Sequence, residues 1–238
     1  METLYGLHPV AECLKAGRRS VRRLWVLSEE RLQELQKASA GGRLPRAEVV
    51  PKDLLLRKAG SPNHQGVVAE VEPYPYVDWQ DLLDPHPVPL VVALDNLEDP
   101  QNVGAILRSA LCAGATGVTL RKHHAAQITA AVAKASAGAC EHLRVALVPN
   151  QPQVMRSAGE AGLNRAALDM EGQSLWEAPL DWRQGLVLVV GAEGAGVSRL
   201  VLSLCEFRLK IPMAGGFDSL NASAAATLAL FEAARNRR

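Results

Sequence analysis

Continuous apolar runs alternate with segments of helical periodicity in the second part of the chain. The runs lie at residues 90–95, 117–121, 143–148, 186–191 and 207–212. A strand that is apolar at successive positions is covered on both faces, and helices between such strands act as crossovers of a parallel sheet. The pattern predicts an α/β domain with a mostly parallel sheet, whose ligands bind beyond the carboxyl ends of the strands.

Residues 72–90 carry five prolines. Because proline fixes φ and lacks an N–H donor, this segment continues neither a helix nor a central strand. We expect a linker at 73–89 between a small domain at 1–72 and a larger one at 90–238. In the small domain, the runs at 23–28 and 66–71 predict strands and those at 30–39 and 52–59 predict helices, which indicates a compact α/β domain.

Two features of the small domain suit RNA. Residues 15–23 hold a lysine and four arginines, namely Arg18, Arg19, Arg22 and Arg23. Such a run can contact phosphates or can simply be a solvated loop, and both interpretations remain open. His64 and Gln65 precede the strand at 66–71 and are able to hydrogen-bond to RNA bases, although a polar surface loop explains them as well.

Composition narrows the classes of protein. The chain of 238 residues is 48% hydrophobic with a net charge of +1, which is typical of a globular protein and does not by itself indicate nucleic acid. Its four cysteines are scattered without the spacing of a zinc site or a disulfide framework, which fits a reducing compartment. No segment resembles a signal peptide or reaches membrane-spanning length. We therefore expect a cytoplasmic protein with neither a metal nor a membrane partner.

The first loop after a predicted strand contains an unusual helix start. Asp99 followed by Pro100 is a typical N-cap and first helical position. Gly104 inside the helix costs about 1 kcal/mol relative to alanine, which indicates that something approaches the backbone closely. Arg108 projects away from the apolar side of this helix. Alone it is explained as a solvated arginine, but together with Asn102 it becomes a candidate functional residue.

The second loop follows the strand at 186–191 and reads Gly191-Ala192-Glu193-Gly194. Its glycine spacing differs from both the dinucleotide fingerprint and the P-loop, and Glu193 would repel a phosphate. A loop with exposed backbone and a carboxylate suits a neutral or cationic ligand.

The third loop places Ser219, Asn221 and Ser223 at alternate positions before an alanine-rich helix. A helix N-terminus needs one such cap, which either Ser219 or Asn221 can supply. The remaining polar groups are then free to line a site, and the preceding Gly215 and Gly216 permit a tight return of the chain.

These three loops, in this order, resemble the signature motifs of the SpoU branch of the SPOUT RNA methyltransferases. The pattern N-x-x-D-P-x-N-x-G-x-x-x-R covers 96–108, G-A-E-G covers 191–194, and I-P-M-x-G…S-L-N-x-S covers 211–223. The resemblance spans about residues 88–238. The stretches YGLHPVAECL and HQGVVAEV also resemble the small substrate-recognition domain of bacterial members that 2′-O-methylate a guanosine in large-subunit ribosomal RNA.

The resemblance implies a deep trefoil knot in the catalytic domain, a homodimer whose active site combines both chains, and S-adenosylmethionine as cofactor. By motif position the cofactor would contact Gly191, Ala192, Ile211, Leu220, Asn221 and Ser223. The catalytic candidates are Asn102, Arg108, Glu193 and Asn221.

Methyl transfer to a ribose 2′-hydroxyl needs an aligned oxygen whose proton is shared or removed. Arginine is a poor base because its pKa exceeds about 12. We expect Arg108 to hold the adjacent phosphate and stabilise developing charge, and Glu193 to orient Arg108 or Asn102, in one chain or across the dimer.

Other functions remain open at this point. Transfer RNA is the main alternative substrate, although the separate N-terminal domain favours ribosomal RNA. An RNA-binding protein with an inactive cofactor site is a further alternative, and the glycine spacing disfavours a nucleotide-dependent oxidoreductase.

Overall fold

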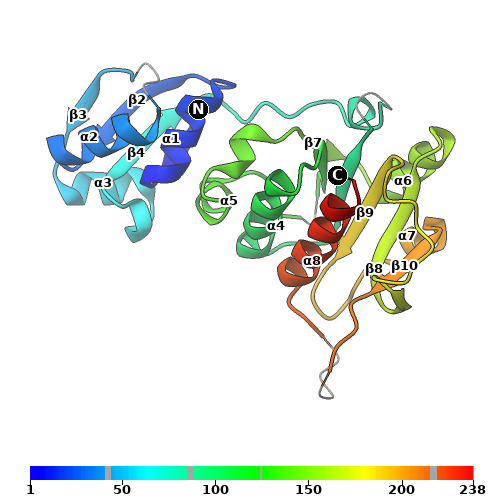
Figure 1. The fold of residues 1–238 in the computed structure, drawn as a ribbon. Helices are drawn as coiled ribbons and strands as arrows, with labels where there is room; N and C mark the ends of the chain where they lie inside the picture. The colour runs from blue at the N-terminus through cyan, green and yellow to red at the C-terminus, as the bar shows by residue number, and fades with distance from the viewer. Residues whose placement is uncertain (41–43, 85–87, 124, 215–218, 238) are drawn as a thin grey trace. The chain divides into compact units, whose positions relative to one another are not determined.

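The structure is a computed structural model that describes residues 1–40, 44–84, 88–123, 125–214 and 219–237. These residues form two compact units, drawn in Figure 1. The first comprises Met1–Pro75 and Ile128–His142, and the second comprises Tyr76–Gln127 and Leu143–Arg238. Residues 128–142 therefore group with the first unit, although they lie inside the range expected for the larger domain.

A four-stranded sheet of order β1-β4-β2-β3 forms the centre of the first unit. Its strands are β1 (Glu2–Tyr5), β2 (Val21–Val26), β3 (Ala47–Val49) and β4 (Val67–Val71). The helices are α1 (Leu7–Ala16), α2 (Glu29–Ala38), α3 (Lys52–Ala59) and α5 (Ala130–Ala135), with 3₁₀ turns at Pro62–His64 and Ala139–His142. The strands and helices predicted for this region are confirmed as β2, β4, α2 and α3, whereas the sequence pattern does not predict β1, β3 or α1.

Six strands in the order β10-β8-β9-β5-β6-β7 build the second unit, and every strand pair in the described part of this sheet is parallel. The strands are β5 (Leu90–Asp95), β6 (Gly117–Arg121), β7 (Val145–Val148), β8 (Asn164–Ser174), β9 (Leu186–Gly191) and β10 (Phe207–Lys210). The helices are α4 (Pro100–Cys112), α6 (Gln151–Glu160), α7 (Arg199–Leu204) and α8 (Ala222–Asn236), with a 3₁₀ turn at Gln80–Leu82. The predicted parallel sheet is confirmed.

Helices cover both faces of this sheet (Figure 1). Val91 and Ala93 of β5 belong to one apolar cluster with residues of α6 and α7. The alternate residues Val92 and Leu94 point to the opposite face, where α4 and α8 pack against each other. Because both faces are covered, all four residues are fully buried, which explains the continuous apolar run in the sequence.

β8 is a strand that the apolar pattern does not predict. Its pairing with β10 shifts register, because Arg208 pairs with Ala167 whereas Leu209 pairs with Gln173. Residues 168–172 therefore bulge out of the ladder. Gly172 lies within this bulge, where a Cβ would run into the backbone of Arg208.

Part of the predicted linker belongs to the second unit. Val77 donates its N–H to the carbonyl oxygen of Val145 at 3.0 Å, and Leu82 is 1% exposed. Leu82 packs so closely on Gly117 that a Cβ at Gly117 would meet its methyl groups. The prolines mark a break between domains, but the apolar side chains between them hold residues 76–84 to the sheet.

The trefoil knot stays a prediction. It would involve the connection from β10 to α8, and this connection includes residues 215–218, with Gly215 and Gly216, which lie outside the described residues.

Candidate active site

The first two motif loops leave the sheet side by side. Asp95, the last residue of β5, is paired in register with Gly191, the last residue of β9. Neighbouring parallel strands end at the same edge of a sheet, so the segments that follow them begin together. Asp95 is buried, and its Oδ2 accepts the N–H of Ser198 at 2.9 Å, which ties the end of the second loop to β5.

One residue from each motif meets in a hydrogen-bonded cluster. Asn102 Nδ2 donates to Glu193 Oε1 at 3.0 Å. Asn221 Nδ2 donates to Asn102 Oδ1 at 2.9 Å and also to Glu193 Oε1. The same carboxylate oxygen accepts the N–H of Ala222 at 3.4 Å. Asn102 is thus bonded directly to two residues, Glu193 and Asn221, that lie 91 and 119 positions further along the chain.

Asn221 is the N-cap of α8. Its Oδ1 accepts the N–H groups of Ser223 and Ala224, at 2.9 and 3.3 Å, while its Nδ2 makes the cluster contacts. A single amide therefore caps the helix and joins the three motifs. Ser223 donates its hydroxyl to Asn221 Oδ1 at 2.5 Å, so it supports the cap.

Arg108 lies on α4, six residues beyond Asn102, which is about 9 Å along the helix axis. Its side chain is exposed, and no hydrogen bond or ion pair engages it within the described ranges. The sequence predicts that Glu193 orients either Arg108 or Asn102. In the structure Glu193 is hydrogen-bonded to Asn102 of the same chain. An unpaired guanidinium is well suited to bind a phosphate through two parallel hydrogen bonds.

A cavity of about 800 Å³ lies beside the cluster. Its walls come from the bulge of β8, the loop after β9, the segment after β10 and the start of α8. Four of the predicted cofactor residues line it, namely Gly191, Ala192, Ile211 and Leu220. Glu193 belongs to both the cavity wall and the cluster, whereas Asn221 and Ser223 belong to the cluster and the cap.

The glycines of the second loop are explained by the way it curls back on itself. Gly196 donates its N–H to the carbonyl oxygen of Ala192 at 2.8 Å. Gly194 and Gly196 have φ values of 77° and 66°, in the left-handed region that favours glycine. A Cβ at Gly191 would run into the backbone of Gly196. The spacing therefore serves a tight backbone turn beside the cavity.

Two carboxylates in the cavity wall are missed by the sequence prediction. Asp169 and Glu171 both come from the bulge of β8, and Asp169 Oδ1 accepts the N–H of Glu171 at 3.2 Å. Because no apolar run predicts β8, the sequence does not show that this strand brings two carboxylates to the edge of the sheet. Among the described residues of the cavity wall, these two and Glu193 supply three carboxylates, and Lys210 is the only lysine.

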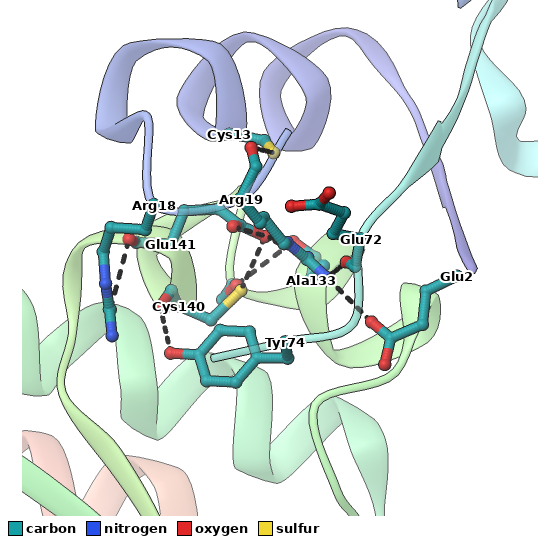
Figure 2. A network of polar contacts seen from close by, with 10 residues as sticks. Glu2, Cys13, Arg18, Arg19, Glu72, Tyr74, Ala133, Cys140 and Glu141 are labelled. Carbon is teal, nitrogen blue, oxygen red and sulfur yellow. Dashed lines mark hydrogen bonds and ion pairs between the residues drawn. The ribbon is translucent and has the colours of Figure 1, made fainter. Parts of the chain in front are cut away.

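Arg19, a predicted RNA contact, is only 5% exposed. Figure 2 shows its guanidinium among acidic side chains: Nε and Nη2 donate to Glu141 at 3.0 and 2.5 Å, and Nη1 donates to Glu2 at 2.7 Å. The guanidinium is already paired and has no exposed side for a phosphate. Its role in this structure is to hold the segment around Glu141 in the first unit.

Tyr74 completes this buried network. Its hydroxyl donates to the carbonyl oxygen of Cys140 at 2.7 Å, and its ring centroid lies 5.4 Å from the guanidinium carbon of Arg19 (Figure 2). Burial opposes the charged form of Arg19, but the hydrogen bonds and charge of Glu141 outweigh it and raise the pKa of Arg19. Burial also raises the pKa of the Cys13 and Cys140 thiols to about 12, so both stay protonated at neutral pH.

The other predicted arginines are more accessible. Arg22 and Arg23 are exposed; Arg22 is ion-paired with Glu72, just after β4, and Arg23 Nε lies 3.9 Å from Glu70 Oε2 of β4. Arg18 is half-buried and donates to the carbonyl oxygens of Glu141 and Pro75, at 3.4 and 3.3 Å. Arg22 and Arg23 thus remain candidates for phosphate contacts.

The loop with His64 and Gln65 has one buried and one exposed side chain. His64 is 3% exposed, and its Nδ1 accepts the N–H of Gly66 at 3.0 Å. Burial lowers the pKa of His64, and the positive charge of Lys52 lowers it further. Gln65 is exposed, has a φ of 52°, and accepts a hydrogen bond from Lys134. Gln65 is therefore the member of the pair that can reach RNA.

Two other kinds of feature, a metal site and a membrane span, are absent from the part of the chain that the structure describes. No group of three His, Cys, Asp or Glu side chains there could hold a metal ion. No helix there is long and apolar enough to cross a membrane.

The fold is that of an α/β protein with two compact units, the second of which has a ligand-sized cavity at the carboxyl edge of its parallel sheet. The chain belongs to the SpoU rRNA Methylase family, whose model matches residues 89–231. Residues 3–77 match the family described as RNA 2′-O ribose methyltransferase substrate binding. The protein is therefore an RNA 2′-O-ribose methyltransferase, as the resemblance implies.

Individual relatives agree with this assignment. An uncharacterized tRNA/rRNA methyltransferase of Mycobacterium ulcerans (strain Agy99) is 40% identical over 243 residues, which covers 100% of this chain and 78% of the relative. The crystal structure of the SpoU methyltransferase AviRb from Streptomyces viridochromogenes, in complex with the cofactor AdoMet, is 30% identical with a TM-score of 0.80, covering 99% of this chain and 90% of its own.

Two further structures differ in how much of the chain they match. An AdoMet-bound rRNA methyltransferase from Sinorhizobium meliloti is 26% identical with a TM-score of 0.77, covering 98% of this chain and 87% of its own. The TrmH/SpoU tRNA modifying enzyme of A. aeolicus is 27% identical with a TM-score of 0.57, covering 66% of this chain and 80% of its own.

Proposed function

We propose that this methyltransferase binds S-adenosylmethionine in the cavity beside β9 and methylates the 2′-hydroxyl of a guanosine in 23S ribosomal RNA. One observation carries the proposal: the cluster of Asn102, Glu193 and Asn221 joins all three motifs, and Glu193 also lines the cavity. The reacting groups would therefore meet where the cavity adjoins α4.

The cavity fits the cofactor in size and in charge. Ligand pockets commonly enclose about 300–1,000 Å³, and this cavity encloses about 800 Å³. Its excess of carboxylates suits a ligand that carries a sulfonium and an ammonium. When bound, S-adenosylmethionine supplies a methyl group on a positively charged sulfur. The residues that would hold it through exposed backbone groups are Gly191, Ala192, Ile211 and Leu220.

Arg108 is the residue that we assign to the RNA side of the reaction. Its exposed guanidinium would bind the phosphate next to the target ribose and stabilise negative charge on the attacking oxygen. Asn102 and Asn221 would fix the loops around the ribose, because both amides are bonded to Glu193. Arginine stays protonated at neutral pH, so we do not assign Arg108 as the base.

A homodimer through the catalytic domain is part of the proposal. Leu228 and Phe231 of α8 are 45% and 49% exposed, and with Ala224 they follow a helical spacing along one side of α8. α8 packs against α4, which carries Arg108. Burial of this apolar side by a second copy would place the partner close to the helix that bears Arg108.

Ribosomal RNA is favoured over transfer RNA by the first unit. The rRNA methyltransferase from Sinorhizobium meliloti matches nearly the whole chain, whereas the tRNA modifying enzyme matches about two thirds of it. The first unit is thus shared with a neighbour named for ribosomal RNA. A ribosomal substrate would also place the enzyme in the bacterial cytoplasm.

The variant Arg108→Ala tests the assignment of the site. We expect methyl transfer to RNA to be abolished while calorimetric binding of S-adenosylmethionine is unchanged. Arg156→Ala is the matched control, because Arg156 is an exposed arginine on α6, which packs on the other face of the sheet. Full activity of Arg108→Ala, or equal losses in both variants, would contradict the proposal.

A further inference from the structure

α5 brings a lysine to the loop that carries Gln65. Lys134 Nζ donates to Gln65 Oε1 at 2.5 Å. Gly6, with a φ of 100°, adjoins the same ammonium, and a Cβ at Gly6 would lie 2.7 Å from Lys134 Nζ. Three segments that are distant in the sequence therefore meet around one positive charge.

In the part of the chain that the structure describes, the charge of Lys134 has no counter-ion. Its hydrogen-bond partner is a neutral amide, and no carboxylate oxygen lies within 4.0 Å of its ammonium among the described residues. Burial lowers the pKa of Lys134, as expected for a half-buried cation. The acidic groups near α5 are already paired, Glu12 with Lys15 and His142, and Glu141 with Arg19. A partly desolvated cation that lacks a counter-ion is stabilised by an anionic ligand.

The position of Lys134 is fixed by the buried network of Figure 2. Arg19 holds Glu141 bidentately, and Tyr74 holds the carbonyl oxygen of Cys140, so both contacts fasten the segment that follows α5 to the first unit. On the other side, Gln65 is held in a left-handed backbone conformation that a residue with a side chain rarely adopts. The ammonium and the amide are thus positioned before any ligand arrives.

We propose that Lys134 and Gln65 form a binding site for a backbone phosphate of the substrate RNA. The RNA-recognition surface then includes a residue from outside the segment that matches the substrate-binding family, which ends at residue 77. This inference rests on the proposed function only in that the ligand is RNA. Phosphate contacts position a nucleic acid without reading its sequence, so the choice between ribosomal and transfer RNA does not alter it.

The test measures RNA affinity of the full-length enzyme against salt concentration. The probes are purified 23S ribosomal RNA and bulk transfer RNA, titrated between about 0.05 and 0.2 M salt. Lys134→Met keeps the apolar stem beside Gly6 but removes the charge, and Lys134→Arg keeps the charge. Lys37→Met is the matched control, because it removes one positive charge from an exposed lysine of α2 that is not among the candidate RNA contacts.

Loss of one phosphate contact lowers the slope of log affinity against log salt by about 0.7–0.9. At about 0.1 M salt this corresponds to an affinity loss of about five- to eightfold. We expect this change for Lys134→Met on both RNAs, with Lys134→Arg and Lys37→Met close to the wild type and calorimetric binding of S-adenosylmethionine unchanged.

An unchanged slope for Lys134→Met would overturn the inference, and so would an equal loss in Lys134→Arg, which would indicate a role in packing rather than charge. A wild-type preference for transfer RNA would overturn the ribosomal assignment alone. Failure of the wild type to bind either RNA would overturn both.

Discussion

Glu193 is the residue on which the site cluster depends, and its replacement gives the most informative perturbation. In Glu193→Ala, the buried Nδ2 of Asn102 loses its acceptor, as does Nδ2 of Asn221. Asn102 is 8% exposed, so water does not readily replace the carboxylate there, whereas Asn221 is exposed and can turn to water. The N–H of Ala222 also loses its contact with Glu193, but at 3.4 Å this contact is weak. The main loss is therefore one buried, charge-assisted hydrogen bond, the one from Asn102.

The size of the effect follows from that bond. A hydrogen bond to a charged group contributes about 1.5–3 kcal/mol, so we expect the free energy of unfolding to fall by about 2 kcal/mol. For a chain of this size that lowers Tm by about 4–8 °C. If the same energy holds the loops in the transition state, kcat/KM falls about 30-fold. Glu193→Gln keeps a carbonyl oxygen at the position of Oε1, and a neutral hydrogen bond of about 1 kcal/mol remains. Its kcat/KM is therefore expected to fall only about fivefold.

Two assays check this prediction together: thermal unfolding followed by circular dichroism, and single-turnover methyl transfer to RNA with labelled S-adenosylmethionine. The ranking of Glu193→Ala below Glu193→Gln in both assays is the expected result. If Glu193→Gln lost as much activity as Glu193→Ala with an unchanged Tm, the charge itself would be acting in catalysis. Hydrogen bonding would then not explain the role of Glu193.

Three further predictions concern the backbone, the buried ion pair and pH. Gly191→Ala places a Cβ against the returning loop, so we expect calorimetric titration to show no binding of S-adenosylmethionine. Arg19→Met leaves Glu141 buried without its partner and is expected to cost about 3–5 kcal/mol in urea unfolding, with most of this recovered in the double variant Arg19→Met/Glu141→Leu. Because burial depresses the pKa of His64 below its ordinary value of 6.5, its contribution to stability is present above that pH and is lost as the pH falls through the folded-state pKa. The pH dependence of urea unfolding should therefore flatten in His64→Phe, and an unchanged profile would contradict this reasoning.

Much of the second unit follows from local sequence patterns. Strands buried on both faces give continuous apolar runs, and parallel strands present their following loops at one edge, so Asn102 and Glu193 could be expected near each other. The N-caps of α4 and α8 are also local features, and the structure confirms Asp99 in the first and Asn221 in the second.

The remaining features depend on contacts between distant parts of the chain. β8 is bulged and half of its residues are polar, so neither periodicity nor an apolar run predicts this strand. Asp169, which lies on the bulge, could not be predicted as a site residue for the same reason. Arg19 looks like a solvated arginine because its partner Glu141 lies 122 positions away. The same long-range pair explains why residues 128–142 group with the first unit, which a division by proline content does not reveal.

The methylated atom and the RNA that carries it can be identified directly in cells. Ribosomal and transfer RNA from cells with and without this gene should be digested to nucleosides and oligonucleotides and compared by mass spectrometry for 2′-O-methylation. We expect one 2′-O-methylguanosine in 23S ribosomal RNA to disappear without the gene and to return with the wild type but not with Arg108→Ala. Loss of a transfer-RNA methyl group with unchanged ribosomal RNA would contradict the substrate, and a methyl group lost from a base would contradict the chemistry.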